Sequence, residues 1–156
     1  MIVNTAYDIQ AKLLAGESQY TPNYIFVEYM NVKKIGDTIP LTTVTPEDTA
    51  DYYYSLGADK DYLAIPITLK PYIAEPTGDN KAAIYYSVVT SGFTEGTKGL
   101  KFSLDKNSTI YGLGLVTRLA DAGTNDILFA RTNLATEKQL LKPTSDIYIN
   151  WKIELQ

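Results

Sequence analysis

The chain has 156 residues, with 18 Asp and Glu against 14 Lys and Arg, which gives a formal net charge of −4. This mild acidity argues against nucleic-acid binding, which needs a basic surface to neutralise phosphates. No apolar run approaches the roughly 20 residues that cross a bilayer. The N-terminus from Met1 to Asn4 lacks the basic and apolar regions of a signal peptide. We therefore expect a soluble protein made in a cytoplasm, with no membrane or nucleic-acid partner.

Two residue types are missing and one is abundant. There is no Cys and no His, so the sequence excludes a disulfide framework, a thiol nucleophile, a thiolate metal site and the usual general base. This lowers the expectation of an enzyme, and no cofactor is expected. The 13 Tyr residues suit either the faces of a β-sheet or a recognition surface.

The first expected element is a short helix over residues 4–16. Ala6, Ile9 and Leu13 fall on one stripe at helical spacing, and Gly16 is a natural C-terminal stop. The stretch from Thr5 to Asp8 resembles a capping box. Residues 1–17 could dock on a sheet or form an arm that swaps onto a neighbouring subunit, and we treat them as an N-terminal helical arm.

Two clear signals follow this helix. The run Tyr24–Met30 is apolar on both sides apart from Glu28, which predicts a central strand covered on both faces. A polar loop, with a weak strand at Ile39–Val44, leads to Thr45-Pro46-Glu47-Asp48. This motif predicts a helix that runs to Leu56 and stops at Gly57. Tyr52, Tyr53 and Tyr54 cannot all face one way on a helix, so at least one should be exposed.

The remainder of the chain reads mainly as strands and turns. Pro66 marks Tyr62–Leu69 as an edge strand or a bulged one, and Tyr72–Asn80 has turn chemistry. Further strands are expected at Ala82–Thr90, Leu100–Leu104, Thr109–Thr117 and Ile127–Arg131, with a helical turn at Thr136–Leu141. Gly112 and Gly114 share one face of their strand, which implies close approach by another backbone or a large side chain such as Trp151.

The last strand, Asp146–Leu155, alternates apolar and polar residues and carries the only Trp of the chain, Trp151. We expect Trp151 to anchor the core. Together the signals predict a mainly β fold: an antiparallel β-sandwich of about seven strands over residues 18–156, with a short N-terminal helix and one short inserted helix.

Candidate site residues are mostly aromatic. The candidate interaction surface is Tyr7, Tyr52, Tyr53, Tyr54 and Tyr72, and the last four could form a platform for stacking on sugar rings. Asp59 with Asp61, and Asp105 with Asn107, have the spacing of calcium ligands, but turn acids are expected at both places anyway. None of the 18 acids is singled out as a glycosidase pair. No catalytic, cofactor-binding or metal-binding residue is assigned.

Several segments, taken in order, resemble a family of small virion structural proteins of tailed bacteriophages. They are Asn4–Gln10, Tyr24–Tyr29, Thr45–Asp48 with Tyr52–Tyr54, Asp61–Leu63 with Ile65–Ile67, Asn107–Gly112, Leu128–Arg131 and Ile149–Ile153. The resemblance spans nearly the whole chain.

The resemblance implies a non-enzymatic, homo-oligomeric particle component, located in the virion after assembly in the host cytoplasm. Its partners would be the major capsid protein or tail proteins. A capsid decoration protein is favoured, because the chain is compact and has no coiled-coil or β-helical shaft. A tail or tail-fibre component that presents a surface to a host glycan, and a free carbohydrate-binding module, stay open.

Overall fold

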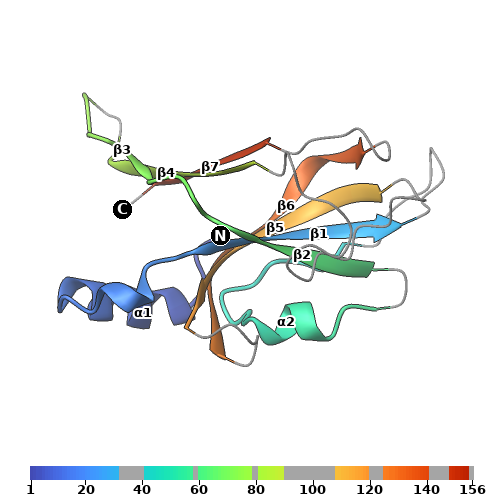
Figure 1. The fold of residues 1–156 in the computed structure, drawn as a ribbon, viewed down its shortest axis with the longest axis horizontal. Helices are drawn as coiled ribbons and strands as arrows, with labels where there is room; N and C mark the ends of the chain where they lie inside the picture. Colours follow the sequence, from blue (N-terminus) through green and yellow to red (C-terminus); the bar gives the residue numbers. More distant parts are fainter. Residues whose placement is uncertain are drawn as a thin grey trace.

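The computed structural model describes residues 1–31, 41–57, 60–78, 81–89, 108–119, 125–140 and 148–154. Within these ranges the chain is mainly β, with seven strands in two antiparallel sheets, two α-helices and a 3₁₀ helix (Figure 1). The helices are α1 (Thr5–Leu14), η1 (Ser18–Tyr20) and α2 (Asp51–Tyr54). The predicted fold class is confirmed at this level, while the packing of the two sheets as a sandwich stays a prediction.

The larger sheet has four strands in the order β2-β1-β5-β6. Their bounds are β1 Tyr24–Asn31, β2 Lys60–Pro66, β5 Ser108–Arg118 and β6 Asp126–Leu140. The five residues from Ile25 to Tyr29 are all buried, and β1 pairs with a strand on each side. The predicted central strand is therefore confirmed. Pro66 closes β2, which is an edge strand as its proline predicted.

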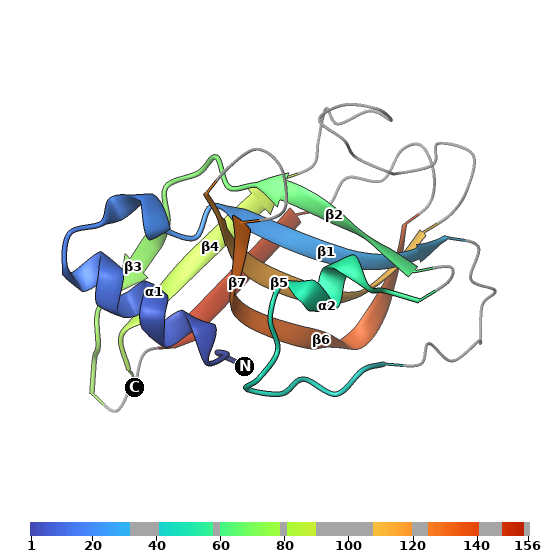
Figure 2. The same cartoon turned by 90° about the horizontal axis from the view of Figure 1, so that it is seen from below.

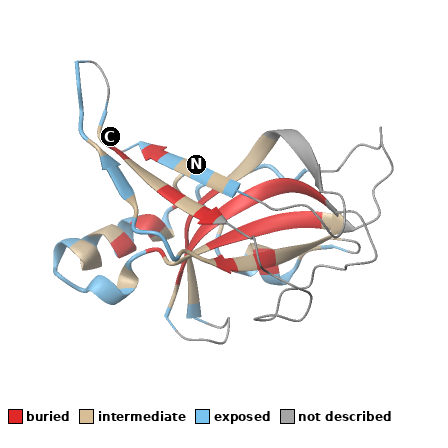
Figure 3. Ribbon diagram, turned by 45° about the horizontal axis from the view of Figure 1, so that its top comes forward, coloured by how far each residue is buried: buried red, intermediate tan, exposed pale blue. Residues whose placement is uncertain are grey.

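The smaller sheet has three strands in the order β3-β4-β7, with bounds Tyr72–Ala74, Ala83–Val89 and Tyr148–Glu154. It lies on the side of the four-stranded sheet opposite α2 (Figure 1). Tyr86, Val88 and Ile153 of this sheet join Ile25, Val27 and other residues of the larger sheet in one hydrophobic cluster. The two sheets thus share a core, and β1 and β5 are its most buried strands (Figure 3).

A second cluster lies on the other face of the four-stranded sheet, beneath α2 (Figure 2). It contains Val3, Phe26, Tyr53, Val116 and Leu128. The strand period of two places alternate residues of β1 in different clusters: Ile25 and Val27 face the smaller sheet, whereas Phe26 faces α2. Both faces of one sheet are therefore covered, each by a different element.

Helix α1 packs against its own chain. Ala6 and Ile9 are fully buried in the main cluster and Leu13 packs against it, so the predicted stripe is confirmed. Gly16 follows the helix with a φ of 89°. The predicted capping box is not formed, because Thr5 donates its hydroxyl to the carbonyl oxygen of Leu128. Exchange of this helix onto a neighbouring subunit stays a prediction.

The helix predicted from Thr45 is wrong in length. Only the four residues of α2 are helical, and Thr45–Asp48 closes a turn in which both the backbone amide and the hydroxyl of Thr45 donate to the Asp48 carboxylate. The local motif is satisfied by a capping-like turn, so nothing forces the helix to begin there. Beyond it, Gly57 lies outside helical structure.

Other corrections concern short segments. Residues 136–140 continue β6 and do not form a helical turn, and Tyr72–Ala74 is a strand and not part of a turn. No strand occupies residues 41–44. The expected strand Leu100–Leu104 lies outside the described residues, as do Ile147 and Leu155 at the ends of the last predicted strand.

Trp151 lies on β7, an edge strand of the three-stranded sheet, and the predicted alternation of this strand is confirmed. Its side chain packs against the main cluster but is only half-buried, while Ile153 two residues later is buried. Because an edge strand has a neighbour on one side only, the ring lies at the margin of the core. The expectation that Trp151 anchors the core is thus too strong.

Candidate functional site

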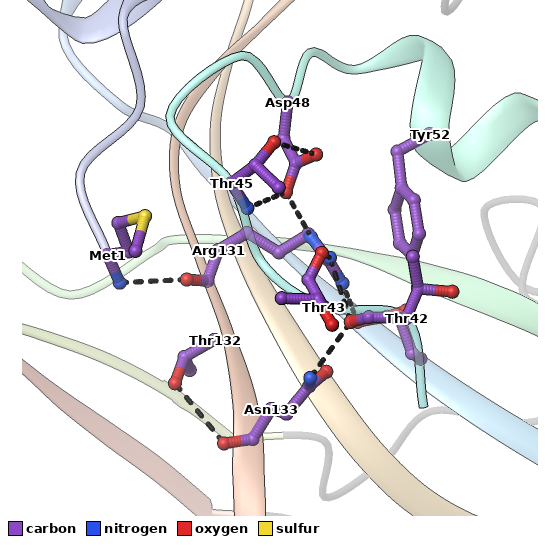
Figure 4. A network of polar contacts seen from close by, with 10 residues as sticks. Met1, Thr42, Thr43, Thr45, Asp48, Tyr52, Arg131, Thr132 and Asn133 are labelled. Atoms are coloured by element: carbon purple, nitrogen blue, oxygen red, sulfur yellow. Dashed lines mark hydrogen bonds and ion pairs between the residues drawn. The ribbon is translucent and has the colours of Figure 1, made fainter. Parts of the chain in front are cut away.

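Arg131 is the centre of the most developed polar network among the described residues (Figure 4). Its side chain comes from β6 and is completely buried. The guanidinium donates to three oxygens of the segment 41–50, here called the strap, which leads into α2. These are the carboxylate of Asp48 at 3.0 Å and the carbonyl oxygens of Thr42 at 3.1 Å and Thr43 at 3.0 Å. One side chain therefore fixes the strap to the sheet.

Neighbouring groups strengthen this attachment. Asn133, two residues along β6, donates its amide to the carbonyl oxygen of Thr42 at 3.0 Å. The ring of Tyr52 lies over the Arg131 guanidinium, 3.9 Å from ring centroid to Cζ. A guanidinium offers five donors in a fixed fork and stacks on aromatic rings, so Arg serves both contacts where Lys could not.

Glu28 supplies the opposite charge from β1. Tyr52 donates its hydroxyl to Glu28 Oε1, and Oε2 lies 4.0 Å from Arg131 Nη1. Burial raises the pKa of the Glu28 carboxyl above its usual value, although the Tyr52 hydrogen bond and the Arg131 charge act against this rise. For Asp48 burial also acts to raise the pKa, but hydrogen bonds from Thr45 and Arg131 outweigh it and hold the pKa below its usual value.

Two glycines leave room for this network. A Cβ on Gly112 would lie 2.8 Å from Cδ of Glu28, and a Cβ on Gly114 would lie 2.6 Å from Cζ of Tyr53. Both distances are shorter than real Cβ contacts, so a side chain at either position would force Glu28 or Tyr53 to move. The predicted close approach to these glycines is confirmed, but the approaching side chains are Glu28 and Tyr53, and not Trp151.

Several polar atoms in this region have no hydrogen-bond partner: Glu28 Oε2, Arg131 Nη1, Tyr53 OH, Tyr111 OH and Asn133 Oδ1. Glu28 and Arg131 have no exposed side-chain surface, so a substrate cannot reach their charged groups. The network is consequently suited to holding the strap and α2 in place. Such a buried network fixes one arrangement of the surrounding chain.

The pKa directions give a pair of predictions of opposite sign. Since folding raises the pKa of Glu28, its ionisation costs stability as pH rises from its unfolded pKa through its folded pKa. Glu28→Gln should therefore gain stability relative to the unmodified protein as pH rises from about 3 to about 7. Asp48, whose pKa is lowered, stabilises above its unfolded pKa, so Asp48→Asn should lose stability over the same range.

Urea unfolding of both variants and the unmodified protein across this pH range measures the effect. Each variant serves as the control for the other, because both remove one carboxylate from the same network. If the two stability differences moved in the same direction with pH, the assignment of the pKa directions would be wrong.

The predicted interaction tyrosines separate into different environments. Tyr53 is only 2% exposed and belongs to the core beneath α2, so its assignment to an interaction surface is wrong. Tyr52 is half-buried over Arg131. Tyr54 is exposed, which confirms that at least one of the three is, and its hydroxyl donates to Asp126 at 2.6 Å.

Tyr7 and Tyr72 are both well exposed, but they lie on α1 and β3, apart from Tyr52 and Tyr54 on α2. The predicted tyrosines therefore do not form one platform. Tyr72 instead lies opposite Tyr85 of β4, with ring centroids 6.0 Å apart. Sequence reasoning missed Tyr85 and Tyr148. Their signal was the alternation of β4 and β7, which places each on the face away from the core.

No family model, curated protein or solved structure matches this chain. Within the described ranges, no helix has the length and apolar character to cross a bilayer, and no three Asp or Glu side chains gather as a metal site. Asp59, Asp105 and Asn107 of the two calcium-like spacings lie outside those ranges.

Proposed function

We propose that this chain is a non-enzymatic structural protein of a tailed-bacteriophage virion, and that it decorates the capsid shell through protein–protein contacts. The observation that carries the proposal is the exposed edge strand β3. Tyr72 and Ile73 point to opposite faces of this strand and are 68% and 66% exposed. The ordered resemblance to phage structural proteins gives the class of particle.

An exposed apolar edge is a typical template for association. Strand β3 is the edge of its sheet and pairs only with β4 among the described strands, so its outer backbone groups face away from the sheet. Proteins that stay monomeric usually protect such edges with charges, prolines or bulges. The β2 edge has Lys60, Asp61 and Pro66, whereas the three residues of β3 carry no charge. Strand addition by a neighbouring protein would cover Ile73.

The polar network fits this role. Arg131 fixes the strap and α2 on one face of the four-stranded sheet, while β3 lies with the other sheet on the opposite face (Figure 1). An interface on a pre-organised body loses less conformational entropy on binding than an interface on a flexible one. A rigid body with an exposed apolar edge is therefore suited to stabilising a shell by contact.

Immunogold electron microscopy of particles from the source, with antibody to this chain, tests the proposal. Label over the heads is expected. Label confined to the tail would overturn the capsid assignment and support the alternative of a tail or tail-fibre component with a receptor-binding surface. Particles without label would overturn the virion assignment and favour a free carbohydrate-binding module.

A matched pair of variants tests the carrying observation. Ile73→Lys should weaken binding of the purified chain to particles that lack it by about tenfold or more, because a charge replaces the exposed apolar side chain at the edge. Tyr54→Lys places the same charge on α2, away from β3, and should bind as the unmodified chain does. Co-sedimentation with the particles measures both. Equal binding by Ile73→Lys would exclude β3 as the contact.

A further inference from the structure

The outer face of the three-stranded sheet carries aromatic and polar side chains in register. Tyr86, Val88 and Ile153 are buried toward the core, so the alternate residues of β4 and β7 face away from it. Pairing across the sheet aligns two outward rows, Tyr72 with Tyr85 and Lys152, and Ser87 with Asn150, and Tyr148 lies on the same outward side of β7 as Asn150 and Lys152. We name this set of residues the tyrosine face.

Two phenol rings of the tyrosine face are open to solvent. Tyr72 and Tyr148 are 68% and 65% exposed, and Tyr85 is half-buried beside Tyr72 with its ring tilted by 49°. Tyr72 and Tyr148 are separated by two strand spacings across the sheet and four residues along it. Strand geometry places the Cα atoms of these two tyrosines about 17 Å apart. A ligand that contacts both rings is consequently extended.

Hydrogen-bonding groups lie between the two rings. Ser87 donates its hydroxyl to Asn150 Oδ1 at 3.0 Å, which fixes the orientation of the amide and leaves its Nδ2 as a donor. The Ser87 oxygen keeps its acceptor capacity. The centre of the face therefore offers both a donor and an acceptor in a fixed position.

The tyrosine face has few charged side chains: Lys152 belongs to it, and Glu154 and the exposed Lys81 lie beside it. Its only cation, Lys152, is paired with Glu154 at 2.6 Å, and both side chains are about half exposed. An anionic polymer needs unpaired Lys or Arg, which this face lacks among its described residues. A purely apolar partner would have to desolvate Asn150, Lys152 and Glu154 without replacing their hydrogen bonds.

We propose that the tyrosine face binds a neutral glycan chain. Sugar rings present C–H groups with a small positive charge, which pack against the negative face of an aromatic ring. Their hydroxyls both donate and accept, which matches the Asn150 amide and the Ser87 hydroxyl. The separation of Tyr72 and Tyr148 places different sugar units on the two rings, so a chain binds and a monosaccharide does not. This inference does not depend on a position in a virion.

The test is an isothermal titration calorimetry experiment on the full chain. The probes are cellohexaose, maltohexaose, chitohexaose and a panel of neutral bacterial surface polysaccharides. At least one probe is expected to bind. Tyr72→Ala and Tyr148→Ala should each weaken that binding by about tenfold or more, an effect similar to the loss of one aromatic ring that stacks on a nucleic-acid base. Asn150→Ala should weaken it as well.

Tyr7→Ala is the matched control, since Tyr7 is 64% exposed but lies on α1, outside the tyrosine face. It should leave glycan affinity unchanged. Circular dichroism and thermal melting check that the exposed-tyrosine variants stay folded.

Three results would overturn the proposal. One is the absence of binding to every probe at millimolar concentration. Another is an equal loss of affinity in Tyr7→Ala. The third is a change of oligomeric state in Tyr72→Ala or Tyr148→Ala without any glycan effect, which would make the face an interface between copies. None of these results bears on particle labelling, so the proposed function fails or stands separately.

Discussion

Replacing Arg131 with Met should lower the free energy of unfolding by about 3–5 kcal/mol, the usual effect of removing one partner of a buried ion pair. Met keeps much of the volume of the side chain but removes all five donors. Glu28 then loses its counter-charge in a fully buried position, and the carbonyl oxygens of Thr42 and Thr43 lose their donor. Asp48 is partly exposed and can turn toward water, so it contributes less.

The loss can be measured by urea unfolding and by the melting temperature, which should fall by about 10 °C for a chain of this size. Lys12→Met is the control, because it removes a cation of similar length from an exposed ion pair with Asp8 and should change stability little. The stability loss of Arg131→Lys should lie between those of Arg131→Met and Lys12→Met. The donors of an ammonium sit on one atom, whereas Arg131 reaches Asp48 through Nε and the two carbonyl oxygens through Nη2. An Arg131→Met variant as stable as Lys12→Met would mean that the network does not hold the fold.

A second readout follows the strap itself. Without the guanidinium, the strap keeps Asn133 and the Thr45–Asp48 turn but loses its attachment to the core of the sheet. Chymotrypsin should then cleave faster after Leu41 or Tyr52 in Arg131→Met. Cleavage within β1 and β5 should accelerate less. This local opening separates a strap attachment from a general loss of stability.

The strands that were predicted well are those whose residues alternate or are apolar throughout. In β4 and β7 the period of two is visible in the sequence, and in β1 the apolar run is interrupted only by Glu28. Strand β3 has three residues next to prolines, too few for any period. The residues Thr45–Asp48 form the hydrogen bonds typical of a helix start, but they do so within a turn that no helix follows directly.

The polar network was not predictable as a unit. Two parts of the network have a signal in the sequence. A buried strand that contains Glu28 predicts a polar partner for its carboxylate, and Gly112 with Gly114 predict the close approach of another group to their strand. Their connection needs the register, which places Glu28 opposite Gly112 and Gly114 opposite Arg131. Register across strands distant in sequence depends on tertiary pairing, which no local pattern encodes.

The tyrosine face was missed for the same reason. The sequence predicts Tyr72 as a contact residue in a turn, in one platform with Tyr52, Tyr53 and Tyr54. Tyr148 is distant from Tyr72 in the sequence, and no local pattern joins the two. Strand β4 brings them into one sheet by pairing with β3 on one side and β7 on the other. The recognition surface therefore arises from strand order.

Gly114→Ala should lower the free energy of unfolding by about 2–3 kcal/mol, a typical effect of overpacking a filled core. The added Cβ would collide with the Tyr53 ring, whose Cζ and Cε2 would lie 2.6 Å and 3.0 Å away. The ring cannot easily move, because it packs edge-on against Phe26 and Tyr52, each at a centroid distance of 5.1 Å. Any accommodation must shift α2 or the sheet.

Gly57→Ala is the matched control for this substitution. Gly57 is exposed, nothing lies within 4 Å of an added Cβ, and its φ is not in the left-handed region. The change should therefore alter stability by less than about 0.5 kcal/mol. Equal effects at the two glycines would show that the space above Gly114 is not filled as described.

Tyr53→Phe decides whether the Tyr53 ring is the cause. Its hydroxyl is buried without a hydrogen-bond partner, so removing it alone should be neutral or slightly stabilising. Combined with Gly114→Ala, it removes the oxygen that lies nearest the new methyl group and should recover part of the loss, though not all, because Cζ remains close. A double-mutant cycle from urea unfolding measures this coupling. A cycle that closes without coupling would place the cost of Gly114→Ala elsewhere in β5, and the glycine would then matter for its backbone and not for the Tyr53 ring that covers it.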